Sequence, residues 1–234
     1  MIGDLHCHTT LSDGSLGIED IIVQAKKTGI DFISITDHET MSSINRAKIL
    51  GERYGVQTIP GVELSAWDKK RNRKVHILCY APQKPDRLEG LCIKSCEIRR
   101  KCAAEMVENV MKLYPITSES VMKHATGSKS IFKQHIMHAL IEYGYTTHFY
   151  GKLNHKLFNH ENGTCIVERE YPDVNFVLDL IHSSKGVAVL AHPMMYDSAE
   201  LLEELAQSGK IDGIEAYHYS ATEEQQQKLC ETAE

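Results

Sequence analysis

Short apolar runs alternate with amphipathic segments along the first part of the chain. Apolar positions at Ile18, Ile22 and Ala25 recur with helical spacing and are followed by Gly29, a residue typical of helix ends. A second predicted helix covers about 42–54 and precedes Gly55. The runs between these helices have the length and β-branched content of buried strands, and they cover 2–5, 31–36, 56–62 and 74–80. This alternation predicts a parallel sheet with helices packed outside it.

The pattern changes between residues 83 and 172, where no strand alternates with the helices. Helical periodicity there predicts helices over 86–113, 118–125 and 130–143. Beyond this stretch the alternation resumes, with predicted helices at 173–184, 198–207 and 222–233 and predicted strands at 187–191 and 213–217. We therefore expect an α/β fold in three parts, namely the first part of a barrel at 1–82, a helical insert or cap at 83–172 and the second part of the barrel at 173–234.

Composition narrows the class of protein. The chain has 234 residues and no run near the roughly 18 to 20 apolar residues that a membrane span needs. Its first ten residues, MIGDLHCHTT, place an acid and histidines where a secretory signal would need an apolar core, so we expect a cytoplasmic protein. Seven cysteines without a CxxC pair argue against a disulfide framework. Cys92 and Cys96 are either half-buried thiols on one helix face or a metal pair, and we favour the thiols.

The net charge of −6 argues against a protein whose whole surface attracts nucleic acid. One basic cluster, KKRNRK at 69–74, interrupts this acidic background. We interpret the cluster as the solvated tip of a hairpin, and a contact with phosphate or RNA is the alternative interpretation.

Histidine is the residue type in clear excess, with 13 copies. Several histidines and acids fall at or beside the ends of predicted strands, where an α/β barrel brings residues together on one face. They are His6, His8, Asp13, Asp37, His38, Glu63 and His192, while His76 lies inside its strand. A single histidine at a strand end is usually structural, and an Asp in a turn often caps a helix. The joint pattern nevertheless predicts a metal site.

The pair formed by His6 and His8 is informative by itself, because residues i and i+2 of an extended segment share a face. Both imidazoles can therefore reach the same ion. Glu63 adds a carboxylate that can bridge two ions, and Asp13 adds a further oxygen ligand. A mixed set of nitrogen and oxygen ligands suits manganese, iron, zinc or cobalt and does not suit calcium.

Five segments resemble those of the polymerase and histidinol phosphatase (PHP) superfamily. They are DLHCHTTLSDG at 4–14, ITDHET at 35–40, GVELSA at 61–66, VHILCY at 75–80 and VLAHP at 189–193, in the order typical of the family. The resemblance implies a distorted (β/α)7 barrel with a helical insert. It is strongest to the branch that contains nucleoside 3′,5′-bisphosphate phosphatases and a 5′-to-3′ exoribonuclease acting on short RNA.

The resemblance also implies two or three divalent ions, with manganese, iron or zinc as the expected metals. It assigns His6, His8 and Glu63 to a first ion, Glu63, His76 and His192 to a second, and Asp13 and His38 to a third. Asp4 and Asp37 would orient the imidazoles of His6 and His38 through their second ring nitrogens.

The family carries a cationic substrate-binding motif in its insert. The aligned residues here include Lys133 and His135, and Arg169 near the end of the insert is a further candidate. The alternative is that these are ordinary surface side chains. The family's last strand, with its Ser-Asp-x-His motif, has no counterpart up to Glu234, so we expect the seventh strand to be missing. His218 is a candidate for one of the ligands of that motif, or for the acid that protonates the leaving group.

Together these residues predict a metal-dependent phosphoesterase that hydrolyses phosphate esters of nucleotides or short oligonucleotides with water activated by the ions. The expected partner is a small phosphorylated substrate, with neither a membrane nor a stable nucleic-acid complex. The two alternatives are a histidinol-phosphate-type phosphatase of the same superfamily and a metal-binding module that has lost catalysis.

Overall fold

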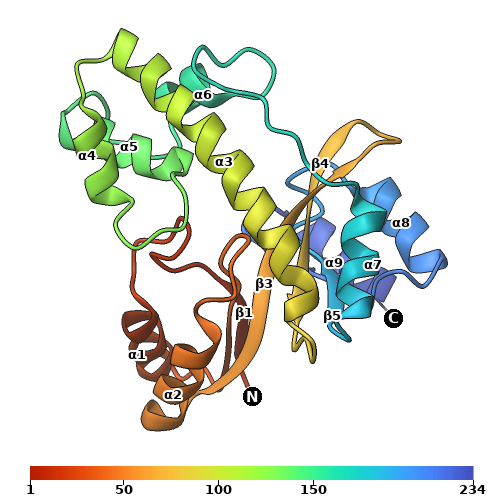
Figure 1. Cartoon of the computed structure of the whole chain (residues 1–234). Coiled ribbons are helices and arrows are strands. Elements are labelled where there is room, and N and C mark those ends of the chain that lie inside the picture. Colours follow the sequence, from red (N-terminus) through yellow and green to blue (C-terminus); the bar gives the residue numbers. More distant parts are fainter. Residues whose placement is uncertain (234) are drawn as a thin grey trace.

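The computed structural model describes residues 1–233, in which the strands form one curled sheet of six strands in the order β1-β2-β3-β4-β5-β6 (Figure 1). The strands are β1 Gly3–Cys7, β2 Phe32–Ile35, β3 Gln57–Asp68, β4 Arg73–Tyr80, β5 Val187–Leu190 and β6 Gly213–Ile214. The helices are α1 Ile18–Thr28, α2 Ile44–Tyr54, α3 Asp86–Leu113, α4 Ser118–His124, α5 Lys133–Glu142, α6 Lys152–Phe158, α7 Val174–Ser183, α8 Ala199–Gln207 and α9 Glu223–Ala233.

The sheet is mixed, which corrects the expectation of a parallel sheet. β1, β2 and β3 are mutually parallel and β5 and β6 are parallel, but β4 is antiparallel to both β3 and β5. Only residues 69–72 separate β3 from β4. A parallel crossover needs a dozen or more residues, so a connection this short makes the two strands a hairpin. The expectation failed because the helix required between two parallel strands is missing at this one position.

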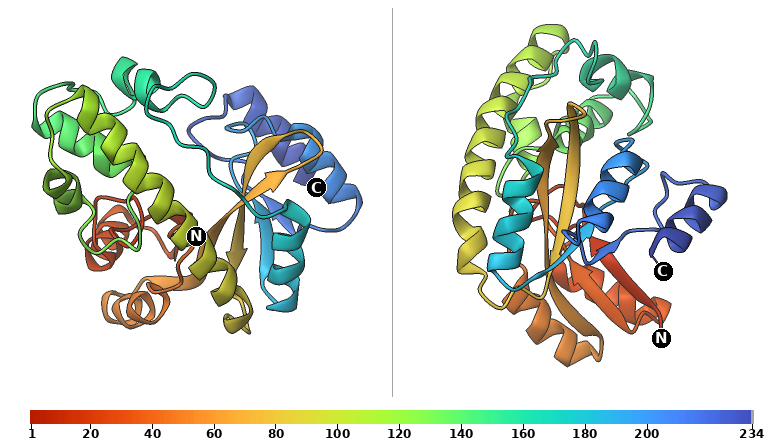
Figure 2. Two further views of the ribbon diagram at one scale, coloured as in Figure 1. Left: turned by 45° about the horizontal axis from the view of Figure 1, so that its top comes forward. Right: turned by 90° about the vertical axis from the view of Figure 1, so that its right-hand side faces the viewer.

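Two apolar clusters hold helices against the sheet. α1 and α2 bury Ile22 and Leu50 against Ile33 of β2. On the other part of the sheet α3, α7, α8 and α9 form a larger cluster, in which Ile181 of α7 and Ile77 of β4 are completely buried. Burying an aliphatic side chain contributes roughly 1.5–3 kcal/mol, so these clusters dominate the stability of the sheet and hold its strands in place. Figure 2 shows the helices on the outside of the curled sheet.

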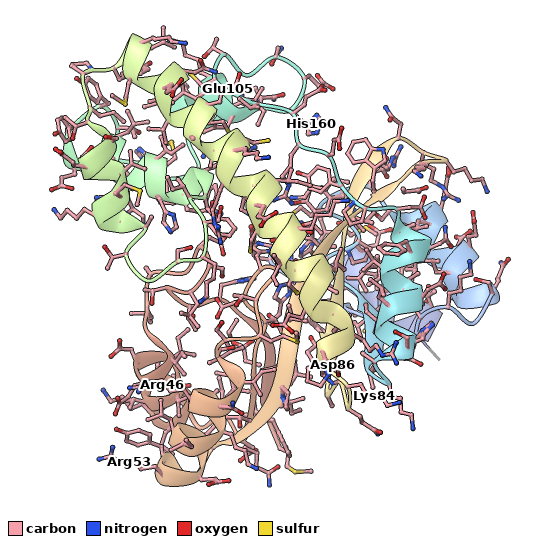
Figure 3. All side chains as sticks on the ribbon, viewed as in Figure 1. Arg46, Arg53, Lys84, Asp86, Glu105 and His160 are labelled. Carbon is pink, nitrogen blue, oxygen red and sulfur yellow. The ribbon has the colours of Figure 1, made fainter. Side chains whose placement is uncertain are left out.

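The long helix α3 connects this part of the molecule to a separate group of helices. Asp86 lies at its first turn and Glu105 lies far along it, beside α4, α5 and α6 (Figures 1 and 3). Leu88 of α3 belongs to the core under the sheet, whereas Val110 belongs to a core shared with α4, α5 and α6. The helices therefore lie where the sequence predicted an insert, although α6 was missed. The division of the chain into three domains stays a prediction.

The remaining sequence-based expectations concern the edges of the sheet and its environment. β1 and β6 are the two outer strands, and a seventh strand is absent from residues 1–233, as expected. β6 is shorter than predicted and ends at Ile214. Within the described part of the chain, none of the helices combines the length and the apolar character that crossing a membrane requires.

Candidate metal centre and the adjoining cavity

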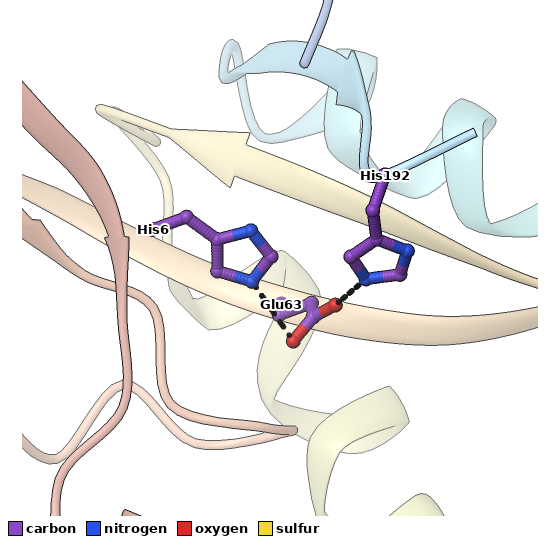
Figure 4. A group of neighbouring side chains, drawn as sticks. All are labelled: His6, Glu63 and His192. Atoms are coloured by element: carbon purple, nitrogen blue, oxygen red, sulfur yellow. Dashed lines mark hydrogen bonds and ion pairs between the residues drawn. The ribbon is translucent and has the colours of Figure 1, made fainter. Parts of the chain in front are cut away.

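Most of the residues predicted to bind metal surround one buried carboxylate, that of Glu63. His6 Nε2, His8 Nε2 and His38 Nδ1 lie 3.2, 3.2 and 3.1 Å from its Oε2, and His76 Nδ1 and His192 Nε2 lie 2.6 and 3.0 Å from its Oε1. Figure 4 shows His6 and His192 on the two different oxygens. A carboxylate that presents each oxygen to a separate group of imidazoles has the arrangement required to bridge two cations.

The strands explain how residues distant in sequence meet at Glu63. His6 lies within β1, and His38 and His192 lie three and two residues after the ends of β2 and β5. Glu63 was expected at the end of its strand, but it lies within β3, because β3 continues to Asp68 in its hairpin with β4. The reversed direction of β4 likewise explains why His76 reaches the cluster from the middle of a strand.

Buried polar atoms without hydrogen-bond partners in the described chain indicate that this cluster binds cations. The atoms His38 Nδ1, Glu63 Oε2, His76 Nε2 and His192 Nδ1 are buried and make no well-aligned hydrogen bond to any described residue. Leaving a buried polar atom unpaired costs about 1–3 kcal/mol, so four together in one cluster indicate a missing ligand. Two groups of three residues could each hold an ion, because the donor atoms within each group lie within 4.8 Å of one another. One group is His6, Glu63 and His192, and the other is His8, His38 and Glu63. Imidazole nitrogen and carboxylate oxygen are the ligands of zinc, manganese and iron sites.

Burial and charge set the protonation of these histidines in the metal-free protein. Burial, together with the positive charge of Lys74, lowers the pKa of His76 to about 3, so its ring is neutral and offers a lone pair. Burial also lowers the pKa of His38 well below its usual range. Burial alone would lower the pKa of His6, but its bonds to Glu215 and Glu63 outweigh burial and raise that pKa to about 10. A cation bound at His6 would therefore displace a proton.

Asp13 lies beside the histidine cluster on a tight loop. Its Oδ1 lies 3.6 Å from His8 Nδ1 and its Oδ2 lies 3.7 Å from His38 Nε2, while Gln134 of α5 donates a 2.9 Å hydrogen bond to Oδ2. The loop can turn this sharply because of Gly14, where a Cβ atom would lie only 2.2 Å from the His8 carbonyl oxygen. The structure thus places Asp13 with His8 and His38, and the assignment of ligands to individual ions stays a proposal.

The two acids predicted to orient imidazoles have other roles. Asp4 is exposed, and its side chain accepts a 3.3 Å hydrogen bond from the backbone N–H of His6 rather than from the imidazole. Asp37 is completely buried and accepts hydrogen bonds from Thr9 N–H, Thr9 Oγ1 and Ser12 Oγ at 2.7, 2.7 and 2.6 Å. It therefore holds the loop that carries His8 and Asp13, and it does not hold the His38 ring.

Glu215 has the orienting role that was assigned to those acids, and the sequence analysis missed it. Its Oε1 accepts a hydrogen bond from His6 Nδ1 at 2.9 Å, and its Oε2 accepts one from the His192 N–H at 2.7 Å. His192 has a φ of 26°, a left-handed conformation that costs energy for a residue other than glycine. Glu215 directly follows β6 in the segment GIE, so its place just after a short apolar run was the available signal.

His218 lies beside the cluster, with its ring centroid 5.0 Å from that of His192 and 6.4 Å from that of His6. Its Nδ1 and the Ser220 hydroxyl are 2.7 Å apart. Burial lowers the pKa of His218, which favours the neutral ring. A neutral imidazole can bind a cation but cannot protonate a leaving group, so this geometry favours the ligand role over the acid role.

The metal cluster opens on a cavity of about 1060 Å³, which is lined by Asp13, His38 and His76 on one side. Four cations line its other walls: Lys74, Arg99, Lys133 and Arg169. Its aromatic lining residues are Trp67, Phe132, Tyr171 and Tyr196, and His160 lies at its outer part, on the segment that leads away from α6 (Figure 3). A second cavity of about 700 Å³ lies between α2 and β3, and no histidine lines it.

Of the three residues predicted to bind substrate, two line the cavity and one does not. Lys133 and Arg169 line the cavity. His135 does not, because its buried ring accepts a hydrogen bond from the Phe132 N–H at 3.1 Å and so caps the start of α5. We therefore leave His135 out of the substrate site. Sequence reasoning missed Arg99, which gives no signal on a long helix that is rich in charged residues.

The buried carboxylate of Glu39 lies beside two of the four cations of the cavity. It forms ion pairs with Arg99 and, at 3.6 Å, with Arg169. Burial alone would raise the pKa of Glu39, but the two arginines lower it to about 2, so the group is ionised. Asp13, Glu161, Glu168 and Glu170 also line the cavity, so its positive charge is local. Lys74 and Lys133 are the lining cations that form no ion pair with a carboxylate in the described chain.

The cysteine pair has no part in this site. Cys92 and Cys96 are both buried, and burial raises the pKa of each thiol, which keeps it protonated. Neither belongs to a group of metal-type ligands in the described part of the chain. The interpretation as thiols buried on a helix agrees with their positions.

Comparison with known proteins places these features in a family. The family model for the PHP domain matches residues 4–213. The chain is 36% identical over 220 residues to the phosphoribosyl 1,2-cyclic phosphate 1,2-diphosphodiesterase of Eggerthella lenta, covering 93% of this chain and 83% of the relative. It is 27% identical over 237 residues to a 5′-3′ exoribonuclease of Haemophilus influenzae, covering 98% of this chain and 84% of the relative.

A solved structure from Bifidobacterium adolescentis, assigned as a metal-dependent phosphoesterase, matches with a TM-score of 0.89 and 25% identity, covering 99% of this chain and 82% of that one. The predicted α/β fold is thereby confirmed. Since these relatives are hydrolases of phosphate esters, the prediction of a metal-dependent phosphoesterase is confirmed at the level of class. With a model match over most of its length and a relative more than 30% identical, the chain belongs to the PHP domain family.

Proposed function

We propose that this protein hydrolyses a small phosphoester that carries a second phosphate group, and that two or three divalent ions are held by the histidine cluster around Glu63. One observation carries this proposal: the cluster of metal-type ligands adjoins a cavity lined by four cations, of which Lys74 and Lys133 form no ion pair with a described carboxylate. The cluster suits the phosphate that reacts, and the cavity suits a phosphate that does not react.

The residues that would hold the ions are His6, His8, Asp13, His38, Glu63, His76 and His192, with His218 as a further candidate. Manganese, iron or zinc fits this mixture of nitrogen and oxygen donors. When bound, such ions supply positive charge to the phosphoryl oxygens and lower the pKa of a water molecule towards neutrality. Glu63 would supply carboxylate oxygens to the ions, and Glu215 would keep His6 and His192 in place for them.

The cations of the cavity would bind and orient the part of the substrate that is not hydrolysed. Arg99 and Arg169 are both fixed by Glu39, so their guanidinium groups are held in position before a ligand arrives. The Nε atom of Arg99 is buried without a hydrogen-bond partner among residues 1–233. Lys133 gives a 3.2 Å hydrogen bond to the Phe158 carbonyl and forms no ion pair with a described carboxylate. These groups suit the oxygens of a phosphate.

The relatives support a substrate with more than one phosphate. The name of the Eggerthella lenta relative specifies a phosphoribosyl cyclic phosphate, and that of the Haemophilus influenzae relative specifies RNA. Both kinds of molecule present a reactive phosphoester and a further phosphate on the same ribose or on the next one. We propose a nucleotide, a short RNA or a phosphorylated ribose as the substrate, acting as a small molecule and without a stable nucleic-acid complex. The cytoplasmic location stays a prediction.

The lining of the cavity also bears on the two alternative functions, a histidinol-phosphate-type phosphatase and a metal-binding module without catalysis. Histidinol phosphate has no second phosphate, so it offers no anion to Lys74 and Lys133, the two lining cations without an ion pair in the described chain. A histidinol-phosphate-type activity therefore fits this site less well. A metal-binding module without catalysis would not need lysines without carboxylate partners in a cavity beside its ions.

The test measures metal content and hydrolysis together: released phosphate reports on the phosphomonoesters, and the ring-opened monoester, detected by phosphorus NMR, reports on the cyclic phosphate. The protein, reconstituted with manganese, is supplied with adenosine 3′,5′-bisphosphate, a phosphoribosyl 1,2-cyclic phosphate and histidinol phosphate. We expect turnover of at least one of the first two and little of the third, and we expect His8→Ala to abolish turnover while the protein remains folded. Metal binding without hydrolysis of any of these compounds would favour the non-catalytic module, and full activity of His8→Ala would contradict the proposed centre.

A further inference from the structure

The basic cluster at 69–74 divides into two groups with different surroundings. Its first four cations are at the hairpin between β3 and β4 and are paired with acids. Lys69 pairs with Asp173 at 3.5 Å, Lys70 with Glu204 at 2.7 Å, Arg71 with Asp68, Glu200 and Glu204 at 3.0, 3.1 and 2.7 Å, and Arg73 with Asp197 at 2.5 Å. These contacts fasten the hairpin to α8 and to the start of α7, which agrees with the interpretation of a hairpin tip.

Lys74, the last cation of the cluster, faces the cavity instead. Its Nζ forms no ion pair with a carboxylate of the described chain, and it donates a 3.2 Å hydrogen bond to the Tyr196 hydroxyl. The ammonium also lies 5.1 Å from the ring centroid of Tyr196 and 5.6 Å from that of Tyr171.

The strand fixes Lys74 relative to the metal cluster. Lys74 and His76 are two residues apart on β4, so their side chains leave the same face of the strand, with their backbone positions about 7 Å apart. Tyr196 lies between them in space: its ring centroid is 5.2 Å from that of His76 and its hydroxyl is bonded to Lys74. One rigid strand thus presents a metal-type ligand and an unpaired cation at a set distance.

We propose that Lys74, together with the Tyr196 hydroxyl, binds the second phosphate of the substrate and sets the distance between that phosphate and the one that is hydrolysed. This rests on the proposed function for the role of the second phosphate, but the anion-binding position itself does not. Lys133 and Arg169 come from the helical segment and the loop after it, whereas Lys74 comes from the sheet. Lys74 is therefore the cation of the cavity whose position relative to the metal cluster depends least on movement of the helices.

The first experiment compares two substrates in matched variants of one hairpin. Lys74→Met removes the charge and keeps the length of the side chain, Lys74→Arg keeps the charge, and Lys70→Met removes a cation that faces α8. With adenosine 3′,5′-bisphosphate we expect kcat/KM to fall at least tenfold in Lys74→Met, mostly through KM, and to recover in part in Lys74→Arg. With adenosine 3′-monophosphate and 5′-monophosphate, which lack the second phosphate, the change should stay below about twofold, and Lys70→Met should behave as wild type. An equal loss on both kinds of substrate, or a loss on neither, would overturn the proposal.

A second experiment does not depend on turnover. Pyrophosphate is titrated into the metal-free protein by calorimetry, and the fluorescence of Trp67 is followed in parallel. Trp67 is the single tryptophan of the chain, and its ring stacks on that of Tyr171 with a centroid distance of 5.8 Å and an interplanar angle of 9°. We expect binding that is weakened at least tenfold in Lys74→Met and unchanged in Lys70→Met. If this result holds while no phosphoester is hydrolysed, the proposed function fails and the anion site stands. Absence of binding to the wild type, or equal binding to all variants, overturns the site.

Discussion

Glu63 is the residue on which the proposed metal centre depends most. Among the described residues it is the only carboxylate that has imidazole nitrogens within 3.2 Å of both of its oxygens. Glu63→Gln keeps the size of the side chain but replaces one oxygen by an amide and removes the negative charge. We expect metal content and phosphoester turnover each to fall by on the order of 100-fold or more, measured by elemental analysis and phosphate release. Glu52→Gln on the exposed face of α2 is the control, and retention of metal in Glu63→Gln would contradict the assignment.

Glu215 is expected to act on the metal centre through the histidines that it holds. Glu215→Gln retains an acceptor for the His192 N–H but removes the charge that faces His6 Nδ1. Changes of this kind beside a metal ligand typically cost about 10–100-fold in metal affinity. Competition with a chromophoric chelator measures the affinity, and circular dichroism checks that the variant is folded. Wild-type affinity in a folded variant would show that Glu215 has only a structural role.

The lowered pKa of Lys133 predicts that substrate binding depends on pH. Burial and the charges of Lys74, Arg169 and Arg99 lower its pKa to about 8, so Lys133 is protonated below that pH and becomes neutral above it. Substrate phosphates are already dianionic above pH 7, because their second pKa is about 6, so their charge does not change in this range. The KM for a bisphosphate should therefore rise between about pH 7 and 9.5. Lys133→Arg should remove this rise because arginine stays charged, and an identical rise in that variant would rule Lys133 out as its cause.

Residue patterns predicted the histidine cluster better than they predicted the residues around it. His6, His8 and His192 lie near strand ends, where the periodicity of the sequence reveals them. Asp37 lies equally near a strand end, but its hydrogen bonds go to Thr9 and Ser12, which only the three-dimensional structure shows. Side-chain direction within a buried loop depends on competing partners, and these are set by packing between segments far apart in sequence.

At the level of elements, the sequence predicted the positions of most helices and strands but not the direction of β4. Hydrophobic periodicity indicates that a strand is present, but it carries no information on whether its neighbour is parallel or antiparallel. The length of the connection does carry that information, and residues 69–72 are too few for a crossover. The interpretation of 69–74 as a hairpin tip already implied an antiparallel pair at this position, which was inconsistent with the expectation of a fully parallel sheet.

The core of the helical segment yields a prediction on stability. Leu140 of α5 is completely buried among the helices α3 to α6. Leu140→Ala should lower the free energy of unfolding by about 2–5 kcal/mol, because it removes buried methyl groups and leaves a cavity. Leu113→Ala is the matched control at the exposed end of α3, where 53% of the residue is accessible, and its effect should stay within about 0.5 kcal/mol. Urea denaturation measures both, and equal effects would show that this core contributes little.

In the whole molecule, the metal cluster joins segments that no apolar core joins directly. Its ligands come from β1, the loop after it, the turn after β2, β3, β4 and the segment after β5. The core against α1 and α2 and the core against α3, α7, α8 and α9 are separate clusters. The buried, unpaired nitrogen and oxygen atoms of the centre lie between these two parts. A ligand that satisfies them should therefore stabilise the arrangement of the two parts relative to each other as well as the site.

This predicts a coupling between metal binding and the stability of the entire fold. A ligand that binds only the native state at about 100 times its dissociation constant adds about 2.7 kcal/mol, which corresponds to roughly 5–10 °C in the melting temperature of a chain of this size. We expect manganese to raise the melting temperature by about that much, and a chelator to reverse the change. Leu140→Ala should melt lower but keep the same shift, because its side chain is remote from the cluster and the two effects should add. Glu63→Gln should show no shift, and a shift of wild-type size in that variant would mean that manganese stabilises the protein from another site.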